Sequence, residues 1–140
     1  MNKIKVLLVE DETSLAMILS DTLEAQGFEM RTAHDGEEGL RMFAEQKPDV
    51  LVADVMMPKM DGWAVCKEIR AVSAVPIIML TAKGDDMDKI LGLDMGADDY
   101  ITKPFNILEV KARIKAIIRR NTKKSREKEN RNILKVKDLT

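Results

Sequence analysis

The chain has 140 residues, a mass of 15.8 kDa and a formal net charge of −1, from 23 basic and 24 acidic side chains. This length suits one domain of ordinary size. Hydrophobic residues at 45% and charged residues at 34% are typical of a soluble globular protein. No apolar run approaches the ~20 residues of a membrane span, and the first residues lack a signal-peptide core, so we expect a cytoplasmic protein. The single cysteine, Cys66, excludes an internal disulfide and a zinc site built from cysteines.

The charge is distributed unevenly along the chain. Residues 119–140 contain nine basic and three acidic side chains, a net charge of +6, whereas residues 1–118 contain 14 basic and 21 acidic ones, a net charge of −7. An acidic body argues against nucleic-acid binding by that part of the chain. The sequence therefore predicts an acidic body followed by a basic tail.

The body begins with a short apolar run, residues 4–9, followed by apolar residues at helical spacing. This pattern predicts a strand and then a helix, which Thr13 or Ser14 can cap and which Gly27 can end by adopting a left-handed conformation.

The same order of apolar run and helix recurs four more times. After a predicted strand at 28–33, Asp35 and Glu38 have the spacing of a capping box and predict a helix that runs to Gln46. The remaining predicted strands cover 49–54, 76–81 and 98–102, and the remaining predicted helices cover 62–71, 86–95 and 107–120, the last capped by Asn106.

Several predicted strands are apolar at nearly every position, as strands covered on both faces must be. Five alternating strands and helices with right-handed crossovers predict an α/β fold, a doubly wound five-stranded parallel sheet with helices on both sides. The order of the strands in the sheet is not predicted by the sequence.

The tail has a different composition. Residues 121–132 contain no apolar side chain and are interpreted as a basic linker after a domain of residues 1–120. Residues 133–139 alternate like a new strand, which would not be stable alone. We therefore expect residues 133–140 to begin a truncated second domain.

Polar side chains follow or end the strands of the predicted sheet. Glu10 and Asp11 follow the first strand, Asp54 ends the third, Thr81 ends the fourth, and Lys103 follows the fifth. The carboxyl ends of parallel strands converge on one crevice, so we expect these five residues to share a site.

Three carboxylates in one crevice repel one another, each pair by roughly 4 kcal/mol at ~4 Å and an effective dielectric constant of ~20. A hard cation such as Mg²⁺ offsets this repulsion, because it prefers carboxylate, water and phosphate oxygens. A carboxylate nucleophile, a divalent cation, a lysine and a hydroxyl are suited to phosphoryl transfer. In this interpretation Asp54 attacks, and Lys103 and Thr81 hold the oxygens of the acyl phosphate that forms.

The chain resembles the receiver domains of two-component response regulators, in particular the winged-helix DNA-binding, OmpR/PhoB-like subfamily. The resemblance is carried by VLLVEDE, VLVADVMMPKMDGW, PIIMLTAK and GADDYITKPFNILEVKARIKAIIRR, and it covers residues 4–120. It implies the (βα)5 flavodoxin-like, CheY-like receiver fold. It also implies a phospho-acceptor regulatory domain that is not an enzyme in the usual sense but assists its own phosphorylation and dephosphorylation.

The resemblance assigns roles to individual residues. Asp54 matches the aspartate that accepts a phosphoryl group from the phosphohistidine of a sensor histidine kinase. Thr81 and Lys103 match the switch hydroxyl and the phosphate-pairing lysine, and Tyr100 matches the aromatic residue that moves inward when Thr81 is drawn to the phosphoryl group. The implied Mg²⁺ ligands are Glu10, acting largely through a water, Asp11, Asp54 and the backbone carbonyl of Met56.

The resemblance also implies an output surface on the fourth helix, fifth strand and fifth helix. Members of the subfamily form symmetric homodimers through this face on phosphorylation and bind DNA through a second domain, and so regulate transcription. The matching residues are Lys89, Asp98, Asp99, Glu109, Arg113 and Arg119 or Arg120.

Three alternatives remain open. An aspartate-nucleophile phosphatase would need a second carboxylate two residues after Asp54, where this chain has Met56. A flavin-binding module would need a glycine- and hydroxyl-rich first loop, where this chain has three acidic residues. A stand-alone receiver that acts by protein–protein interaction is the third, and the strand predicted at 133–139 disfavours it.

Overall fold

The computed structural model describes residues 3–57, 60–82, 96–103 and 105–120. The helix predicted at 86–95, the linker at 121–132 and the segment 133–140 lie outside the described residues. The labelled elements are β1 (Lys5–Val9), α1 (Thr13–Ala25), β2 (Glu29–Ala33), α2 (Gly36–Gln46), β3 (Val50–Asp54), α3 (Gly62–Arg70), β4 (Ile77–Ala82) and β5 (Asp99–Lys103). A further helix covers residues 107–120.

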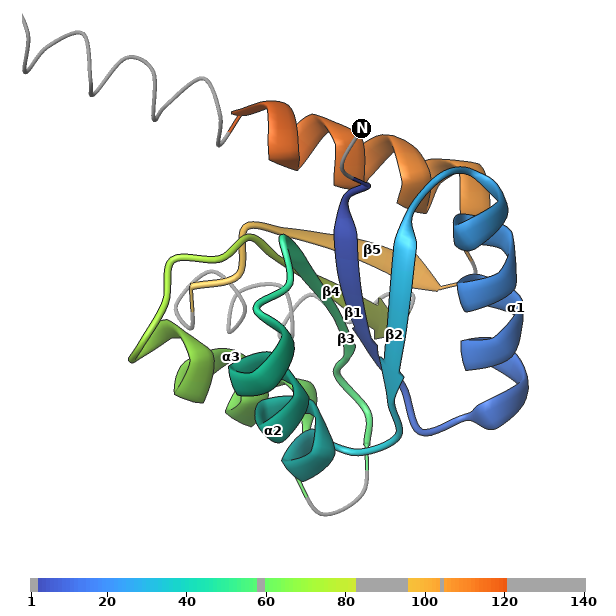
Figure 1. Cartoon of the computed structure of the whole chain (residues 1–140). Helices are drawn as coiled ribbons and strands as arrows, with labels where there is room; N and C mark the ends of the chain where they lie inside the picture. Colours follow the sequence, from blue (N-terminus) through green and yellow to red (C-terminus); the bar gives the residue numbers. More distant parts are fainter. Residues whose placement is uncertain (1–2, 58–59, 83–95, 104, 121–140) are drawn as a thin grey trace, which may run out of the picture.

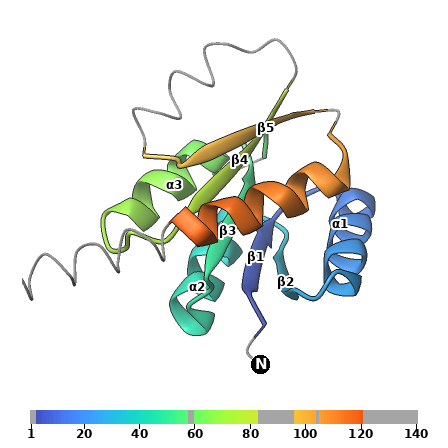
Figure 2. The ribbon, with the colours of Figure 1, turned by 90° about the horizontal axis from the view of Figure 1, so that it is seen from above.

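The five strands form one parallel sheet in the order β2-β1-β3-β4-β5. The helices lie on both sides of the sheet (Figures 1 and 2). The predicted fold is confirmed, and the structure adds the strand order. From β1 the chain adds β2 on one side of the sheet and then β3, β4 and β5 on the other. The direction of growth therefore reverses between β1 and β3, and open α/β sheets bind ligands at such a reversal point.

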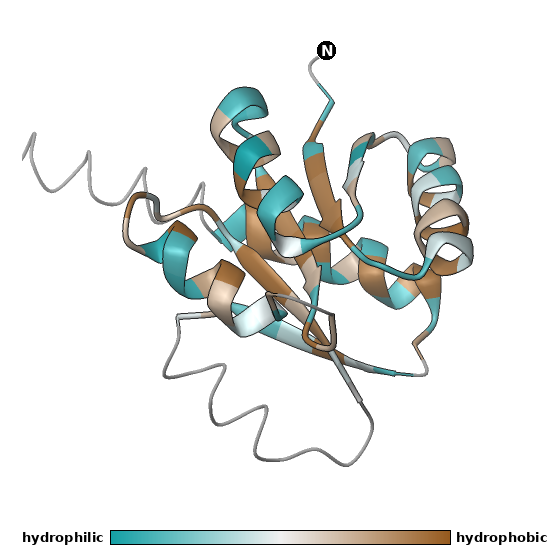
Figure 3. Ribbon diagram, turned by 90° about the horizontal axis from the view of Figure 1, so that it is seen from below, coloured by the Kyte–Doolittle hydropathy of each residue, from teal (hydrophilic) through white to brown (hydrophobic). Residues whose placement is uncertain are grey.

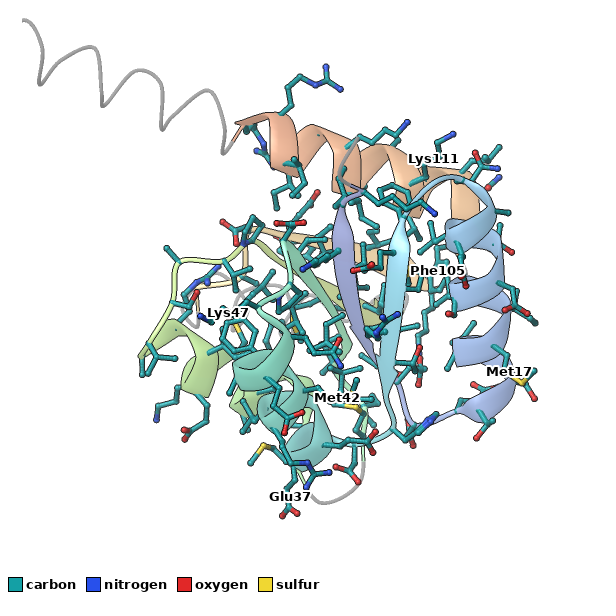
Figure 4. All side chains as sticks on the ribbon, in the orientation of Figure 1. Met17, Glu37, Met42, Lys47, Phe105 and Lys111 are labelled. Atoms are coloured by element: carbon teal, nitrogen blue, oxygen red, sulfur yellow. The ribbon has the colours of Figure 1, made fainter. Side chains whose placement is uncertain are left out.

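Residues along each central strand alternate between two hydrophobic clusters. Val6 and Leu8 of β1 belong to the cluster under α1 and the helix 107–120, whereas Leu7 and Val9 belong to the cluster under α2 and α3. Most of the length of the central strands is accordingly hydrophobic in Figure 3. Phe105 and Met42, labelled in Figure 4, pack against the first and the second cluster respectively.

Most of the predicted helix ends are present. The Asp35 side chain accepts from the Glu38 amide at 2.8 Å, and the Asn106 side chain accepts from the Leu108 amide at 2.8 Å. Gly27 has the expected positive φ, 101°, just after α1 ends. Within the described ranges, no helix is long and apolar enough to cross a membrane.

The predicted cap of the first helix is wrong. Thr13 is already the first helical residue and Glu12 is the N-cap, without a hydrogen bond from its side chain. The Glu12 amide donates instead to Glu10 Oε2 at 3.1 Å, and the Glu12 carbonyl accepts from the Ala16 amide at 2.9 Å. Contacts of the buried Glu10 carboxylate therefore set where the helix begins.

Candidate functional site

The carboxyl ends of the strands lie together at the lower edge of the sheet in Figure 1. Asp54 is the last residue of β3, and its partner on β4 is Leu80, one residue before Thr81. Lys103 ends β5 beside Ala82. Glu10 directly follows β1 and donates its amide to the Ala33 carbonyl at 3.0 Å. Four different strands therefore supply the polar residues of this edge.

Three acidic residues form a compact cluster at this edge. One carboxylate oxygen from each of Glu10, Asp11 and Asp54 lies within 4.8 Å of the others. Glu10 and Asp54 are 0% and 3% exposed, whereas Asp11 faces solvent. Burial raises the pKa of Glu10 to about 8, helped by the charge of Asp54 and opposed by the hydrogen bond from the Glu12 amide and by Lys103.

Lys103 is the basic member of the cluster. Its Nζ lies 2.8 Å from Asp54 Oδ2 and 3.8 Å from Glu10 Oε1. Burial lowers the pKa of Lys103, but the hydrogen bond to Asp54 and the charges of Asp54 and Glu10 more than offset this, so the pKa is raised. The cluster therefore holds one ammonium and three carboxyl groups, and its net charge is −2 when all three carboxyl groups are ionised.

Two buried oxygens at this edge lack a hydrogen-bond partner among the described residues: Glu10 Oε1 and Thr81 Oγ1. Buried polar groups are nearly always satisfied, so unpaired ones at a candidate site indicate room for an external partner. The Asp54 Oδ1 atom, by contrast, accepts from the Met56 amide at 3.1 Å.

The donor set fits a hard divalent cation. Carboxylate oxygens gathered within 4.8 Å of one another are ligands that Mg²⁺ prefers, and the ion keeps waters at its remaining positions. No soft sulfur or imidazole donor belongs to this cluster in the described part of the chain. Glu10, Asp11 and Asp54 could therefore hold such an ion.

Tyr100 lies on β5, paired with Met79, and is half-buried against the cluster under α2 and α3. Met56, two residues after Asp54, is 70% exposed. The residues that the sequence predicts to share the crevice thus lie at one edge of the sheet, and the closest contact among them joins Lys103 to Asp54.

Most of the described residues of the predicted output surface form ion pairs within the chain. Arg113 contacts both carboxylate oxygens of Asp99 at 3.1 Å and lies 3.7 Å from Glu109. Arg119 is exposed, and Lys89 lies outside the described residues. Asp98 is bonded within the chain: its Oδ2 pairs with Arg70 at the end of α3 and accepts from the Ile77 amide at 2.8 Å.

Two features of the structure were not identified from the sequence. Arg70 donates to three backbone carbonyls as well as to Asp98, and nothing in its local pattern indicates this. Gly62 lies against the backbone of Asp54. A signal for Gly62 exists, since it directly follows the capping Asp61 as Gly36 follows the capping Asp35.

An open doubly wound α/β domain with an acidic, lysine-containing crevice at its switch point has the architecture of a signalling receiver. Residues 6–115 match the family described as the response regulator receiver domain. Because this match spans most of the chain, the protein belongs to that family, which is a regulatory family and not one of catalytic enzymes.

Relatives and solved structures agree with this assignment. The chain is 53% identical over 122 residues to the alkaline phosphatase synthesis transcriptional regulatory protein PhoP of Bacillus subtilis (strain 168), covering 86% of this chain and 50% of PhoP. It is 54% identical over 121 residues to the probable transcriptional regulator ycf27 of Guillardia theta, covering 86% and 48%. These similarities are consistent with the OmpR/PhoB-like subfamily. The chain spans about half the length of these curated relatives.

Among solved structures, a putative response regulator from Chloroflexus aurantiacus superimposes with a TM-score of 0.80 and 39% identity, covering 84% of this chain and 98% of that one. The chemotaxis protein CheY4 of Vibrio cholerae gives a TM-score of 0.78 and 35% identity, covering 82% and 98%. The fold is therefore the CheY-like receiver fold.

Proposed function

We propose that this chain is the receiver part of a two-component response regulator and that Asp54 accepts a phosphoryl group from the phosphohistidine of a sensor histidine kinase. The observation that carries the proposal is the cluster at the carboxyl edge of the sheet. There a nearly buried aspartate touches Lys103, lies beside two further carboxyl groups, and is close in the sheet to Thr81, whose buried Oγ1 has no hydrogen-bond partner among the described residues.

In the proposed reaction an Asp54 carboxylate oxygen attacks the phosphorus atom, and the bond from phosphorus to the histidine nitrogen breaks. The leaving imidazole takes the electron pair of that bond and then a proton, and an acyl phosphate remains on Asp54. The Lys103 ammonium, which now pairs with Asp54 Oδ2, would pair with the added phosphoryl oxygens. The Met56 amide holds Oδ1 in place at 3.1 Å.

Glu10, Asp11, Asp54 and the backbone carbonyl of Met56 would hold Mg²⁺. When bound, the ion would neutralise negative charge on the phosphoryl group and on the three carboxylates.

The signal would leave the site through β4 and β5. Thr81 Oγ1 is buried and has no hydrogen-bond partner in the part of the chain that the structure describes, so a phosphoryl oxygen at Asp54 would offer it a hydrogen bond. Tyr100, on the neighbouring strand, would follow this movement. A change in β5 would reach a set of residues that we propose as a homodimer face: Asp98, Asp99, Glu109, Arg113, Arg119 and the undescribed Lys89. Within the chain, Asp98 pairs with Arg70 and Asp99 pairs with Arg113.

The output would be regulation of transcription. Both relatives named above are transcriptional regulators about twice as long as this chain. Their length supports an organisation of receiver at 1–120, linker at 121–132 and the start of a DNA-binding, winged-helix domain at 133–140. A stand-alone receiver is the alternative. Location in the cytoplasm stays a prediction.

The central proposal is tested with Mg²⁺, a small-molecule phosphodonor and intact-mass measurement. The wild-type chain is expected to gain one phosphoryl group, and Asp54→Ala is expected to gain none. Asp21→Ala, which removes an exposed aspartate of α1, is the matched control and should react like the wild type. A phosphoryl group on Asp54→Ala, or none on the wild type, would refute the assignment.

A further inference from the structure

Gly62, the first residue of α3, is pressed against the backbone of Asp54. A Cβ atom at Gly62 would lie 2.3 Å from the Asp54 carbonyl oxygen and 2.9 Å from the Asp54 carbonyl carbon. It would also lie 2.6 Å from the Cε atom of Met79, which is the flexible end of a side chain. The two contacts with Asp54 are with backbone, so only a residue without a side chain fits.

Hydrogen bonds hold this piece of backbone from two sides. The Gly62 amide donates to the Val55 carbonyl at 3.1 Å, and the Val55 amide donates to the Leu80 carbonyl of β4 at 3.0 Å. The next amide, of Met56, donates to Asp54 Oδ1. The start of α3 and strand β4 therefore clamp the residues that carry and orient the Asp54 carboxylate.

We infer that Gly62 is a positioning residue for phosphoryl transfer: by letting the start of α3 contact the Asp54 carbonyl, it sets where the Asp54 carboxylate stands. This inference rests on the proposed function of Asp54. A methyl group at Gly62 must push the start of α3 and the Asp54 carbonyl apart by about 0.7 Å, because real Cβ contacts essentially never fall below 3.0 Å and this one would be 2.3 Å. A misplacement of ~1 Å can slow a reaction by ~100-fold.

The chain offers a matched control in Gly36, the first residue of α2. Gly36 follows the capping Asp35 as Gly62 follows the capping Asp61, and both caps accept an amide at 2.8 Å. A Cβ at Gly36 would also overlap its surroundings, at 2.8 Å from Met60 Cβ and 2.9 Å from the Met60 carbonyl oxygen. Gly36→Ala thus applies the same change at the same helix position. It presses on Met60, two residues before Gly62, but does not overlap the backbone of Asp54, so the difference between the two variants isolates the contact with Asp54.

The experiment compares wild type, Gly62→Ala and Gly36→Ala at equal concentrations of folded protein. The phosphorylation rate with Mg²⁺ and a small-molecule phosphodonor is measured by intact mass, and the Met56 amide resonance is recorded by NMR in unreacted protein. We expect Gly62→Ala to react roughly 10–100-fold more slowly than Gly36→Ala, and its Met56 amide to shift further, because this amide reports the position of Asp54 Oδ1.

Equal rates and equal Met56 shifts in the two variants would overturn the inference. If the wild type itself gains no phosphoryl group, the proposed function fails instead, and the Met56 resonance still decides whether Gly62 positions Asp54.

If Gly62→Ala does not fold, a milder pair replaces it: Asp61→Ala removes the cap that holds the start of α3, and Asp35→Ala removes the equivalent cap of α2. The inference then requires that Asp61→Ala is phosphorylated more slowly than Asp35→Ala and that its Met56 amide resonance shifts further. Equal rates and equal shifts in these two variants would overturn the inference.

Discussion

Arg70 connects three segments at the end of the sheet opposite the acidic cluster, and its removal should lower the stability of the protein more than removal of an ordinary surface arginine. Its Nε donates to the Gly96 carbonyl at 2.8 Å, and its Nη1 donates to the carbonyls of Val75 at 2.6 Å and Ser73 at 3.3 Å. Its Nη2 pairs with Asp98. The guanidinium thereby joins the end of α3, the loop before β4 and the segment before β5.

The magnitude follows from these contacts. A hydrogen bond to a charged donor contributes about 1.5–3 kcal/mol, and carbonyls that lose their partner inside the fold add to the cost. The Arg70 side chain is 22% exposed, so water can replace part of the network. We therefore expect Arg70→Ala to lower the free energy of unfolding by about 2–4 kcal/mol. Arg113→Ala, which removes an ion pair whose arginine side chain is 45% exposed, should cost only about 0–1 kcal/mol.

Urea unfolding, followed by the fluorescence of Trp63, measures both values. Trp63 is the only tryptophan in the sequence and is 7% exposed, so its emission reports the loss of the core. Asp98→Ala and the double variant complete a thermodynamic cycle, in which we expect a coupling of about 1 kcal/mol or more between Arg70 and Asp98. The reasoning is refuted if Arg70→Ala is no more destabilising than Arg113→Ala.

Three further predictions concern the acidic cluster, the lone thiol and the output surface. Mg²⁺ should stabilise the wild type, by about 1.4 kcal/mol at ten times its dissociation constant, and should stabilise Asp11→Ala much less; equal stabilisation in urea unfolding would contradict the ligand assignment. Burial raises the pKa of the Cys66 thiol, so above pH ~9 the thiol ionises in the unfolded chain before it ionises in the folded one, and the free energy of unfolding falls. Cys66→Ala should lose this decline between pH 8 and 10. An unchanged decline in the variant would contradict the role of the thiol. Phosphorylated wild type should elute as a dimer in size-exclusion chromatography and phosphorylated Arg113→Ala as a monomer, whereas identical elution would argue against the proposed face.

Local patterns in the sequence were enough to predict most elements, because each depends on near neighbours. Burial on both faces makes a strand apolar at nearly every position, and this pattern identifies β1, β3 and β4. Gly27 and Asp35 occupy helix ends for reasons of backbone conformation and hydrogen bonding that act within a few residues.

The predictions that failed or changed depend on contacts that the type and spacing of the residues do not show. Thr13 has the chemistry of a cap, but Glu12 is the N-cap, and its amide bonds to the buried carboxylate of Glu10 two residues away. Asp98 looks like a surface charge, and only the approach of Arg70, 28 residues away, makes it part of the fold.

The sequence by itself determined that acidic residues, a threonine and a lysine stand at the carboxyl ends of parallel strands, because the strand-helix alternation places those ends at one edge. Only the tertiary structure decided the strand order, the burial of Glu10 and Asp54, and the 2.8 Å contact between Lys103 and Asp54. It also revealed that Gly62 must lack a side chain, since that requirement arises from the separation between a helix start and the end of a strand. Distances of this kind come from packing, to which residues far apart in the sequence contribute together.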